Sequence, residues 1–282
     1  MSMIIIARLT LREASRRKVV WGLLILSGVF LALYTLGWVF VKQGVAEFGS
    51  PARMGDLRML YNFLMMAGLY TANFLIVMLA VLISVDTLAG EINSGTMQSI
   101  AVKPLARRTI VLGKWLGFAI VLGLCVLLLA GGVLIITWVV SGYVPPNPWS
   151  GPLLMYVEAL LFLSATFLGG TRLSTLANGV LGFGLFGLAF IGSFIEQIGG
   201  YAQQFGLSSS EAATQIGRIT SLLMPSQAVW RRALADMAEG LNPIRAMTIG
   251  AATPDNGVIV YAIAYVGVLL FLAVGSFQRR DL

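Results

Sequence analysis

The chain has 282 residues, of which 58% are hydrophobic and only 11% are charged, and its mean hydropathy is +0.88. Soluble domains carry roughly 25% charged residues, so this composition excludes an ordinary soluble protein and indicates an integral membrane protein. The formal net charge of +7 is spread sparsely between apolar runs. Such sparse charge cannot form a continuous phosphate-binding face, which argues against binding of nucleic acid.

Two residue types that build most catalytic and metal sites are nearly absent. The sequence has no histidine and one cysteine, Cys125, which lies within an apolar run. The lack of an imidazole excludes histidine-based zinc sites, haem ligation by histidine and Ser-His catalysis. A single cysteine excludes an intrachain disulfide and a cysteine metal cluster. We therefore expect no metal site, no bound cofactor and no covalent catalysis by this chain.

The apolar runs predict an all-α membrane protein. Crossing the hydrocarbon layer takes about 20 apolar residues in a helix, because every backbone polar group must be satisfied within the segment. Six stretches meet this requirement: residues 19–41, 63–85, 111–140, 152–170, 175–197 and 257–277. The third is long enough to tilt or to extend beyond the membrane. The first stretch is too long for a removable signal peptide and is therefore interpreted as a permanent span. Residues 1–282 are interpreted as a single transmembrane domain.

The distribution of Lys and Arg predicts that both termini lie in the cytoplasm, since basic residues near the ends of spans are retained on that side. With the N-terminus inside, 12 of the 19 basic residues are cytoplasmic. Those twelve are Arg8, Arg12, Arg16, Arg17, Lys18, Lys103, Arg107, Arg108, Lys114, Arg172, Arg279 and Arg280. Four of the other seven fall in the long segment before the last span, where the rule is weak.

Residues 4–18 precede the first span and have the pattern of an amphipathic helix. Arg8, Arg12 and Arg16 share one face with Ser15, and the small or apolar residues of another face are Ala7, Leu11 and Ala14. We expect this helix to lie along the inner membrane surface. Ordinary basic sequence flanking a span would show the same charges, so periodicity alone leaves both interpretations open.

Residues 86–114 lie between the second and third spans and are too polar for lipid. The stretch 91–100 can form a short helix interrupted at Gly95, Pro104 cannot continue a helix, and Arg107 with Arg108 marks the return to the membrane. The residues alone also fit a solvated loop, but the pattern is more structured than a simple linker requires. We therefore expect another protein to dock on this segment.

Several short motifs in this segment resemble a known family. Glu91, the Gly95-Thr96 pair, Pro104, Arg107 and Gly113-Lys114 resemble the signature between spans two and three of type-2 ABC exporter permeases, the type V exporters, and the final FQRRDL is similar to that family's usual terminus. The resemblance covers the layout of the whole chain, and its specificity lies in the order and spacing of the motifs.

The resemblance implies a function and a set of partners. Residues 86–110 would form the cytoplasmic coupling segment, with the coupling helix at 91–101, and Arg8, Arg12 and Arg16 would anchor the N-terminal helix. The chain would be the permease of an ATP-driven exporter in a bacterial plasma or inner membrane. Two copies of a separate ATP-binding subunit would hold ATP and Mg. A second permease, identical or homologous, would complete the path within the membrane lipid.

Residues 199–256, between the fifth and sixth spans, are expected to lie outside and to contain two short helices. A capping box at Ser208 and Glu211 predicts the start of a helix that ends at Pro225. Ser226 is expected to cap a second helix, which ends at Gly240. Its predicted apolar face consists of Val229, Trp230, Ala233, Leu234 and Met237, and its predicted polar face consists of Arg231, Arg232, Asp236 and Glu239. Similar permeases place a lid or re-entrant element here, but a plain interfacial helix fits equally well.

Two polar residues within the spans are candidates for the translocation path. Glu158 lies in the fourth span, where an ionisable side chain costs about 2.5–3.5 kcal/mol on insertion scales and usually faces a partner or a water-filled cavity. Asn73 in the second span is a weaker candidate, because one amide can simply bond a neighbouring helix. A structural hydrogen bond also explains Glu158. Glu196 is expected to reach the outer surface.

Small residues predict where helices approach closely. Gly113 and Gly117 have GxxxG spacing, Ala119 and Gly123 repeat the small-xxx-small pattern, and the fifth span contains Gly179, Gly182, Gly184 and Gly187. Packing within one subunit is the default interpretation, and a seam between two subunits is the alternative.

These sequence features leave three functions to compare. The permease interpretation needs an external motor, because the chain has no G-x(4)-GK[ST] motif and Gly113-Lys114 is followed by Trp115. The alternative is a self-sufficient secondary carrier or channel, which predicts intramembrane charges or an inverted repeat, and only Glu158 supports it. A membrane enzyme is the least supported, because no serine has an available base and no paired aspartates occur.

Overall fold

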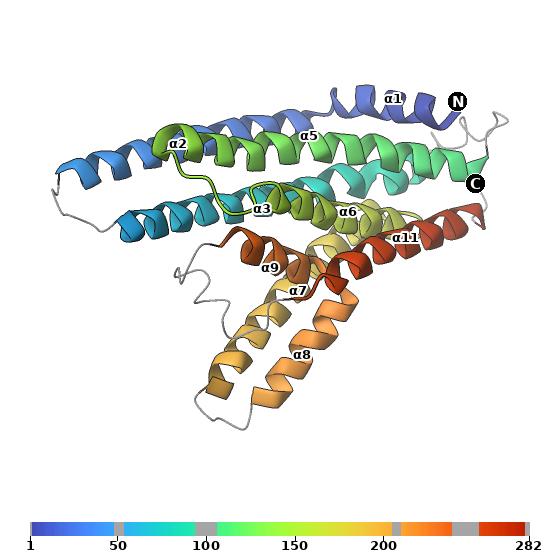
Figure 1. Ribbon diagram of the computed structural model, residues 1–282. Helices are drawn as coiled ribbons and strands as arrows, with labels where there is room; N and C mark the ends of the chain where they lie inside the picture. The colour runs from blue at the N-terminus through green and yellow to red at the C-terminus, as the bar shows by residue number, and fades with distance from the viewer. Residues whose placement is uncertain (1, 48–53, 94–105, 205–209, 239–253, 280–282) are drawn as a thin grey trace.

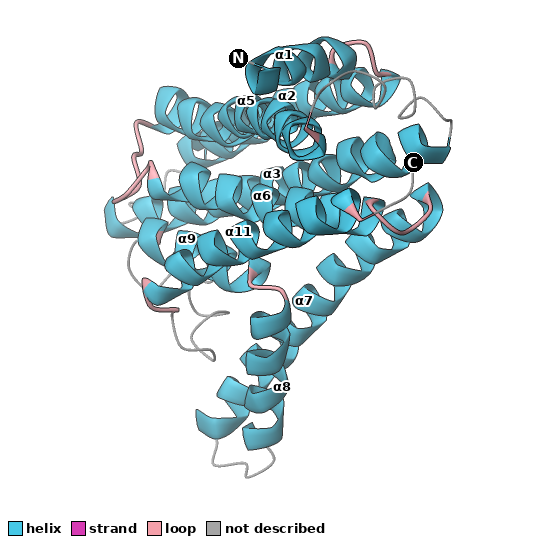
Figure 2. Cartoon of the chain, turned by 90° about the vertical axis from the view of Figure 1, so that its right-hand side faces the viewer, coloured by secondary structure: helices cyan, strands magenta, loops and turns pink. Residues whose placement is uncertain are grey.

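A computed structural model describes residues 2–47, 54–93, 106–204, 210–238 and 254–279, which fold entirely into helices and their connections (Figures 1 and 2). The helices in these ranges are α1 (Ser2–Ala14), α2 (Lys18–Glu47), α3 (Met54–Asn93), α5 (Arg107–Ser141), α6 (Ser150–Gly170), α7 (Thr175–Gln204), α8 (Ser210–Leu223), α9 (Ser226–Met237) and α11 (Gly257–Gln278). The prediction of an all-α protein is confirmed for these residues.

Six of these helices are long and apolar enough to cross a membrane, which confirms the six predicted spans. The candidate spans are Val20–Gly44, Leu57–Thr87, Arg107–Ser141, Ser150–Gly170, Thr175–Gly200 and Gly257–Gln278. α3 is longer than the predicted span at both ends and continues to Asn93. The chain is therefore helical through residues 86–93, the first part of the predicted cytoplasmic segment.

The centre of the bundle is formed by α3 and α6. In their most apolar stretches 61% and 72% of residues are buried, against 11% in α2 and 17% in α11. Buried side chains of the core include Met65, Leu69, Phe162 and Phe167. α2 and α11 lie at the margin (Figure 1), so their exposed apolar side chains are available to lipid. A polar group on α3 or α6 is thus placed in the interior rather than facing lipid.

Glycine and proline determine where several helices end. α5 ends at Gly142, whose φ of 70° suits glycine and whose N–H donates to the carbonyl of Trp138. α8 ends at Leu223, as expected from Pro225 two residues later. The predicted cap of α9 is wrong: Ser226 is the first helical residue, and its buried Oγ has no hydrogen-bond partner among the described residues. α9 ends at Met237, before Gly240, and both Gly240 and the capping residue Ser208 lie outside the described ranges.

The N-terminal helix α1 packs along the first part of α5. A Cβ placed on Gly113 would lie 2.8 Å from Cβ of Ile6, and one on Gly117 would lie 2.7 Å from Cβ of Thr10. Both contacts advance by four residues on both helices, so α1 and α5 run side by side in the same direction. The GxxxG pair therefore serves packing within one subunit, as the default interpretation held, and its partner is α1.

The fifth span α7 leaves the bundle and forms a hairpin with α8 that projects from the other helices (Figures 1 and 2). Within the bundle, a Cβ on Gly182 would lie 2.7 Å from a methyl group of Val81 on α3. Gly184 and Gly187 instead face open space, with nothing within 4 Å of an added Cβ. The glycine-rich segment of α7 is thus only partly used for contacts within the described chain.

Candidate functional site

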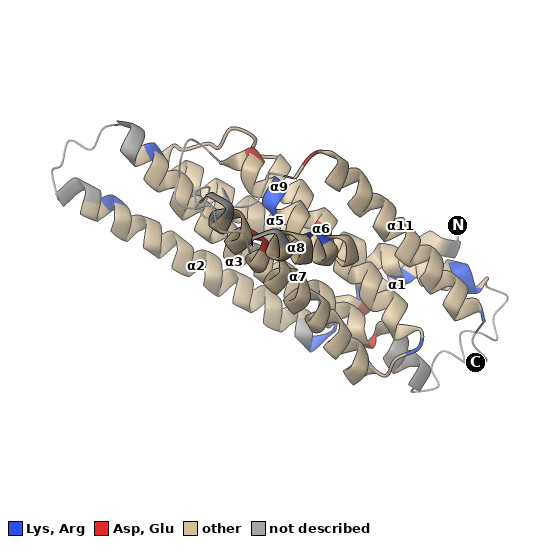
Figure 3. Cartoon of the chain, turned by 90° about the horizontal axis from the view of Figure 1, so that it is seen from below, with Lys and Arg blue, Asp and Glu red and all other residues tan. Residues whose placement is uncertain are grey.

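Basic residues gather at the end of the bundle where the two termini lie (Figure 3). This end combines α1, the end of α3, the start of α5, the turn after α6 and the end of α11. Arg107 begins α5, and its Nη1 donates to the carbonyl of Gln278 at the end of α11, 3.2 Å away. The start of α5 is therefore tied both to the N-terminal helix and to the C-terminal end of the last span.

The predicted coupling residues lie at this end only in part. Glu91 belongs to the last turn of α3, although nothing is described for its side chain. Gly95, Thr96 and Pro104 lie outside the described residues. Of the five predicted coupling residues, the structure thus gives contacts for Arg107, and the coupling role of all five stays a prediction.

The predicted two faces of α1 are present. Arg8, Arg12 and Arg16 are exposed, whereas Ala7 and Ala14 are 4% and 1% exposed. Packing on α5 accounts for the buried face, since the side chains of Ile6 and Thr10 and the backbone oxygen of Ala7 lie against the two α5 glycines. Exposed Ile4, Ile5 and Leu9 accompany the arginines, so the free face is both basic and apolar.

Asn73 and Glu158, which the sequence singles out separately, meet in the core. Nδ2 of Asn73 on α3 donates to Oε2 of Glu158 on α6 at 2.9 Å, and the two residues are 4% and 0% exposed. The other carboxyl oxygen of Glu158 and the amide oxygen of Asn73 have no hydrogen-bond partner among the described residues. Buried polar atoms of this kind are usually satisfied by ordered water or a ligand.

A second buried polar pair lies under α9, and sequence analysis missed it. Nη2 of Arg231 donates to Oε2 of Glu196 on α7 at 2.9 Å, with side-chain exposures of 7% and 12%. The predicted polar face of α9 is thus wrong at Arg231, and Glu196 is largely covered. The predicted apolar face is correct, since all five of its residues are buried. α9 contacts both α6 and α7, so it is covered on two sides.

An aromatic contact lies between the two polar pairs. The rings of Tyr70 and Trp230 meet edge to face with centroids 4.9 Å apart, and Tyr70 precedes Asn73 by one helical turn. Trp230 adjoins Arg231 in the chain, and Arg231 retains two buried nitrogens without a partner among the described residues. We call Asn73, Glu158, Glu196 and Arg231 the buried polar cluster. It joins α3, α6, α7 and α9 in the half of the bundle away from the chain termini.

An open hollow of about 510 Å³ reaches the Glu196–Arg231 pair of this cluster from the surface. Its polar lining includes Glu196, Arg218, Arg231, Asp255 and Tyr261. Both signs of charge are present there, so the hollow can accept polar or zwitterionic groups. The described residues contain no group of three metal-ligating side chains. Chemically, this arrangement can hold water or polar groups inside an apolar bundle, whereas it offers no activated nucleophile.

These features define a class: a helical, multi-span membrane protein with a basic N-terminal helix and an interior polar cluster. The family model of the ABC-2 family transporter protein matches residues 4–282. The chain therefore belongs to the ABC-2 transporter family and is a transmembrane, non-catalytic subunit of an ABC-2 type transporter, which confirms the resemblance seen in the motifs. No curated protein matches the chain.

Proposed function

We propose that this chain forms one half of the translocation path of an exporter and is driven by a separate ATP-binding subunit, present in two copies. The observation that carries the proposal is the packing of α1 on α5 through Gly113 and Gly117. This contact joins the N-terminal helix to the helix that directly follows the predicted coupling segment. A displacement of residues 86–110 would consequently move α1 and α5 together rather than a loop alone.

The docking surface on this end would combine residues 91–101 with the exposed face of α1. By the resemblance, Glu91 and the Gly95-Thr96 pair would supply the contact, and Arg8, Arg12 and Arg16 are exposed and can meet acidic groups or lipid. Arg107 holds the start of α5 against the end of α11 through its hydrogen bond to the carbonyl of Gln278. ATP and Mg would be held by the partner subunit, consistent with the missing P-loop.

The translocation path would pass the buried polar cluster. Asn73 and Glu158 lie on the two central helices, and their oxygens that have no partner in the described part of the chain would bind water or a polar substrate group. Glu158 is also the one feature that would favour the alternative, a self-sufficient carrier, because intramembrane carboxyl groups serve ion coupling in such proteins. Family membership favours the ATP-driven function.

A second permease, either a copy of this chain or a homologue, would complete the path. Support comes from α7, where Gly184 and Gly187 leave open space and Val180, Phe183 and Phe190 are exposed. Small residues flanked by apolar side chains allow another helix to approach closely. We propose that both termini face the cytoplasm of a bacterial plasma or inner membrane, since the basic end would then follow the positive-inside rule.

The test is whether ATP hydrolysis still moves the permease when the coupling segment is altered. A cysteine at Arg218, placed in a Cys125→Ala background, reports the hollow beside the cluster by its labelling rate with and without ATP. In Glu91→Ala and Gly95→Pro we expect normal membrane insertion and continuing ATP hydrolysis, but no ATP-dependent change in labelling. Gln43→Ala, at an exposed polar position on α2 at the opposite end and outside the hollow, is the control. Unchanged ATP-dependent labelling in both coupling variants would refute the assignment.

A further inference from the structure

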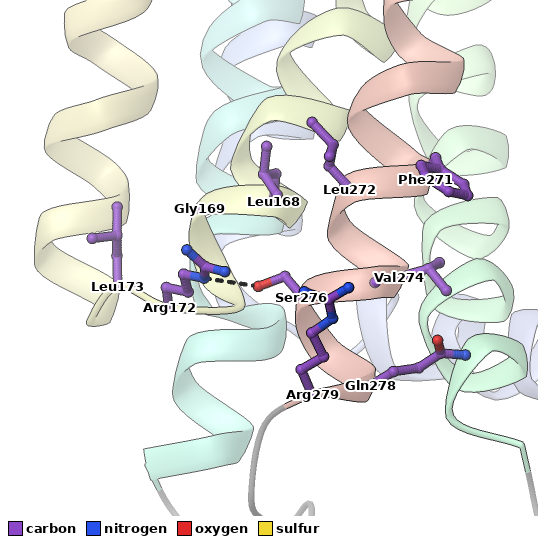
Figure 4. A pocket seen from close by; sticks show the side chains of 11 residues that line it. Leu168, Gly169, Arg172, Leu173, Phe271, Leu272, Val274, Ser276, Gln278 and Arg279 are labelled. Carbon is purple, nitrogen blue, oxygen red and sulfur yellow. Dashed lines mark hydrogen bonds between the residues drawn. The ribbon is translucent and has the colours of Figure 1, made fainter.

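A basic pocket lies between the ends of α6 and α11, at the opposite end of the bundle from the buried polar cluster. It has a volume of about 710 Å³. Its walls come from Leu168 and Leu173 around the turn after α6 and from Phe271 and Leu272 on α11, with Arg172 and Arg279 at its rim (Figure 4). The candidate spans end at Gly170 and Gln278. Both arginines therefore lie at the height where lipid headgroups meet the ends of these spans.

Both arginines have N–H donors that make no hydrogen bond within the described part of the chain. Nε of Arg172 donates to Oγ of Ser276 at 3.0 Å, and this contact directs the side chain toward α11. Figure 4 shows the side chain of Arg279 also extending toward Ser276. Among the described residues, no group bonds the terminal nitrogens of Arg172 or any nitrogen of Arg279. No acidic side chain lines the pocket, so its charge is uncompensated by the part of the chain that is described.

The apolar wall extends from the basic rim into the span. Phe271 is 79% exposed, Leu272 is 47% exposed and Leu173 is 37% exposed. Phe271 precedes Arg279 by two helical turns, a distance of about 12 Å along the axis. The pocket thus has a cationic rim and a hydrocarbon wall in the order in which a phospholipid presents its headgroup and acyl chains.

We propose that this pocket binds an anionic phospholipid. The phosphate lies between Arg172 and Arg279, whose planar guanidinium groups donate paired hydrogen bonds that suit phosphate oxygens. The acyl chains lie against Phe271, Leu272 and Leu173. A bound lipid would tie the turn that joins spans four and five to the last span. With the proposed orientation this is a lipid of the inner leaflet, but the proposal requires neither that orientation nor an ATP-binding partner.

Charge and position favour a lipid over other occupants. Free phosphate could use the arginines but would leave the apolar wall uncovered. A second copy of this chain would need an acidic or neutral surface against two guanidinium groups, while the bundle end that carries this pocket is dominated by basic residues. An anionic lipid satisfies both the charge of the rim and the exposed wall of α11.

Native mass spectrometry of the purified full chain in mild detergent tests the proposal. The chain is titrated with phosphatidylglycerol and, separately, with phosphatidylcholine. We expect preferential binding of phosphatidylglycerol. A basic residue near an anionic membrane surface changes affinity by roughly fivefold, so Arg172→Gln and Arg279→Gln should each weaken binding by about that factor, and the double variant by roughly 30-fold. A double Lys variant, which keeps the charge but cannot donate paired hydrogen bonds, should bind more weakly than the unaltered chain and more tightly than the double Gln variant.

Control variants distinguish binding in the pocket from a general effect of positive charge on lipid binding. The double variant of Lys18→Gln with Arg108→Gln removes the same charge from exposed positions at the same end, and it should leave binding unchanged. Equal loss in this control, or equal binding of the two lipids by the unaltered chain, would overturn the proposal. Displacement of the lipid by glycerol phosphate at equal concentration would identify a phosphate site instead. Binding to monomers but not to dimers would show that a second copy occupies the pocket.

Discussion

The pairing of Asn73 with Glu158 gives a prediction about both stability and function. Asn73→Leu removes the only described donor to a carboxyl group that is 0% exposed. Leaving a buried polar group without its partner costs about 1–3 kcal/mol. Replacing both partners by apolar residues of similar shape is nearly neutral, so Asn73→Leu combined with Glu158→Met should recover most of the loss. The two substitutions should therefore show a coupling energy of about 1–3 kcal/mol.

Unfolding in mixed detergent and SDS micelles measures the free energy of unfolding of the unaltered chain, the two single variants and the double variant. The same variants are then assayed, with their ATP-binding subunit, for the ATP-dependent change in labelling at position 218. If the pair lies on the translocation path, the double variant is stable but impaired in this change. Strictly additive losses, within about 0.5 kcal/mol, would refute the pairing. A stable double variant with an unaltered response would show that the pair is structural only.

Three further predictions follow from contacts elsewhere in the bundle. Gly117→Leu should detach α1 from α5 and cost about 1–3 kcal/mol of stability through overpacking. Gly131→Leu is the control, because an added Cβ there meets nothing within 4 Å. Proteolysis should cleave the N-terminal helix faster in Gly117→Leu than in Gly131→Leu. Arg231→Gln should destabilise the chain by about 1–3 kcal/mol, because it leaves the partly buried carboxyl group of its partner on α7 without an ion pair, and a loss below about 0.5 kcal/mol in SDS unfolding would contradict that pair. In intact cells an impermeant thiol reagent should label Asn256→Cys but not Ser15→Cys; the reverse pattern would invert the proposed topology.

The helices themselves could be predicted from the sequence because each span satisfies its own backbone hydrogen bonds. Apolar length alone therefore locates them, whatever their neighbours are. The ends of α5 and α8 also depend on local sequence, since Gly142 and Pro225 end the adjoining helical turn. The cap at Ser226 failed because the chain enters α9 directly from Pro225, so Ser226 is already helical and its hydroxyl is buried.

Contacts between helices could be predicted less well. The spacing of Gly113 and Gly117 indicated a close approach, but it could not identify α1 as the partner rather than a second subunit. Pairing of Asn73 with Glu158 depends on the relative register of α3 and α6, which no local pattern encodes. Arg231 was assigned to a polar face because periodicity assumes one buried side, whereas α9 is covered by two helices.

The central claim is that residues 86–110 and α1 couple this chain to a separate ATP-binding subunit. Its most direct test is affinity purification of the tagged chain in mild detergent, with ATPase activity measured on the eluate for the unaltered chain and for Glu91→Ala. We predict that an ATP-binding protein co-elutes with the unaltered chain and that less of it is recovered with the variant, while the recovered subunit still hydrolyses ATP. A chain that repeatedly elutes without ATPase activity would contradict the claim and favour a self-sufficient carrier, with Glu158 as the next residue to alter.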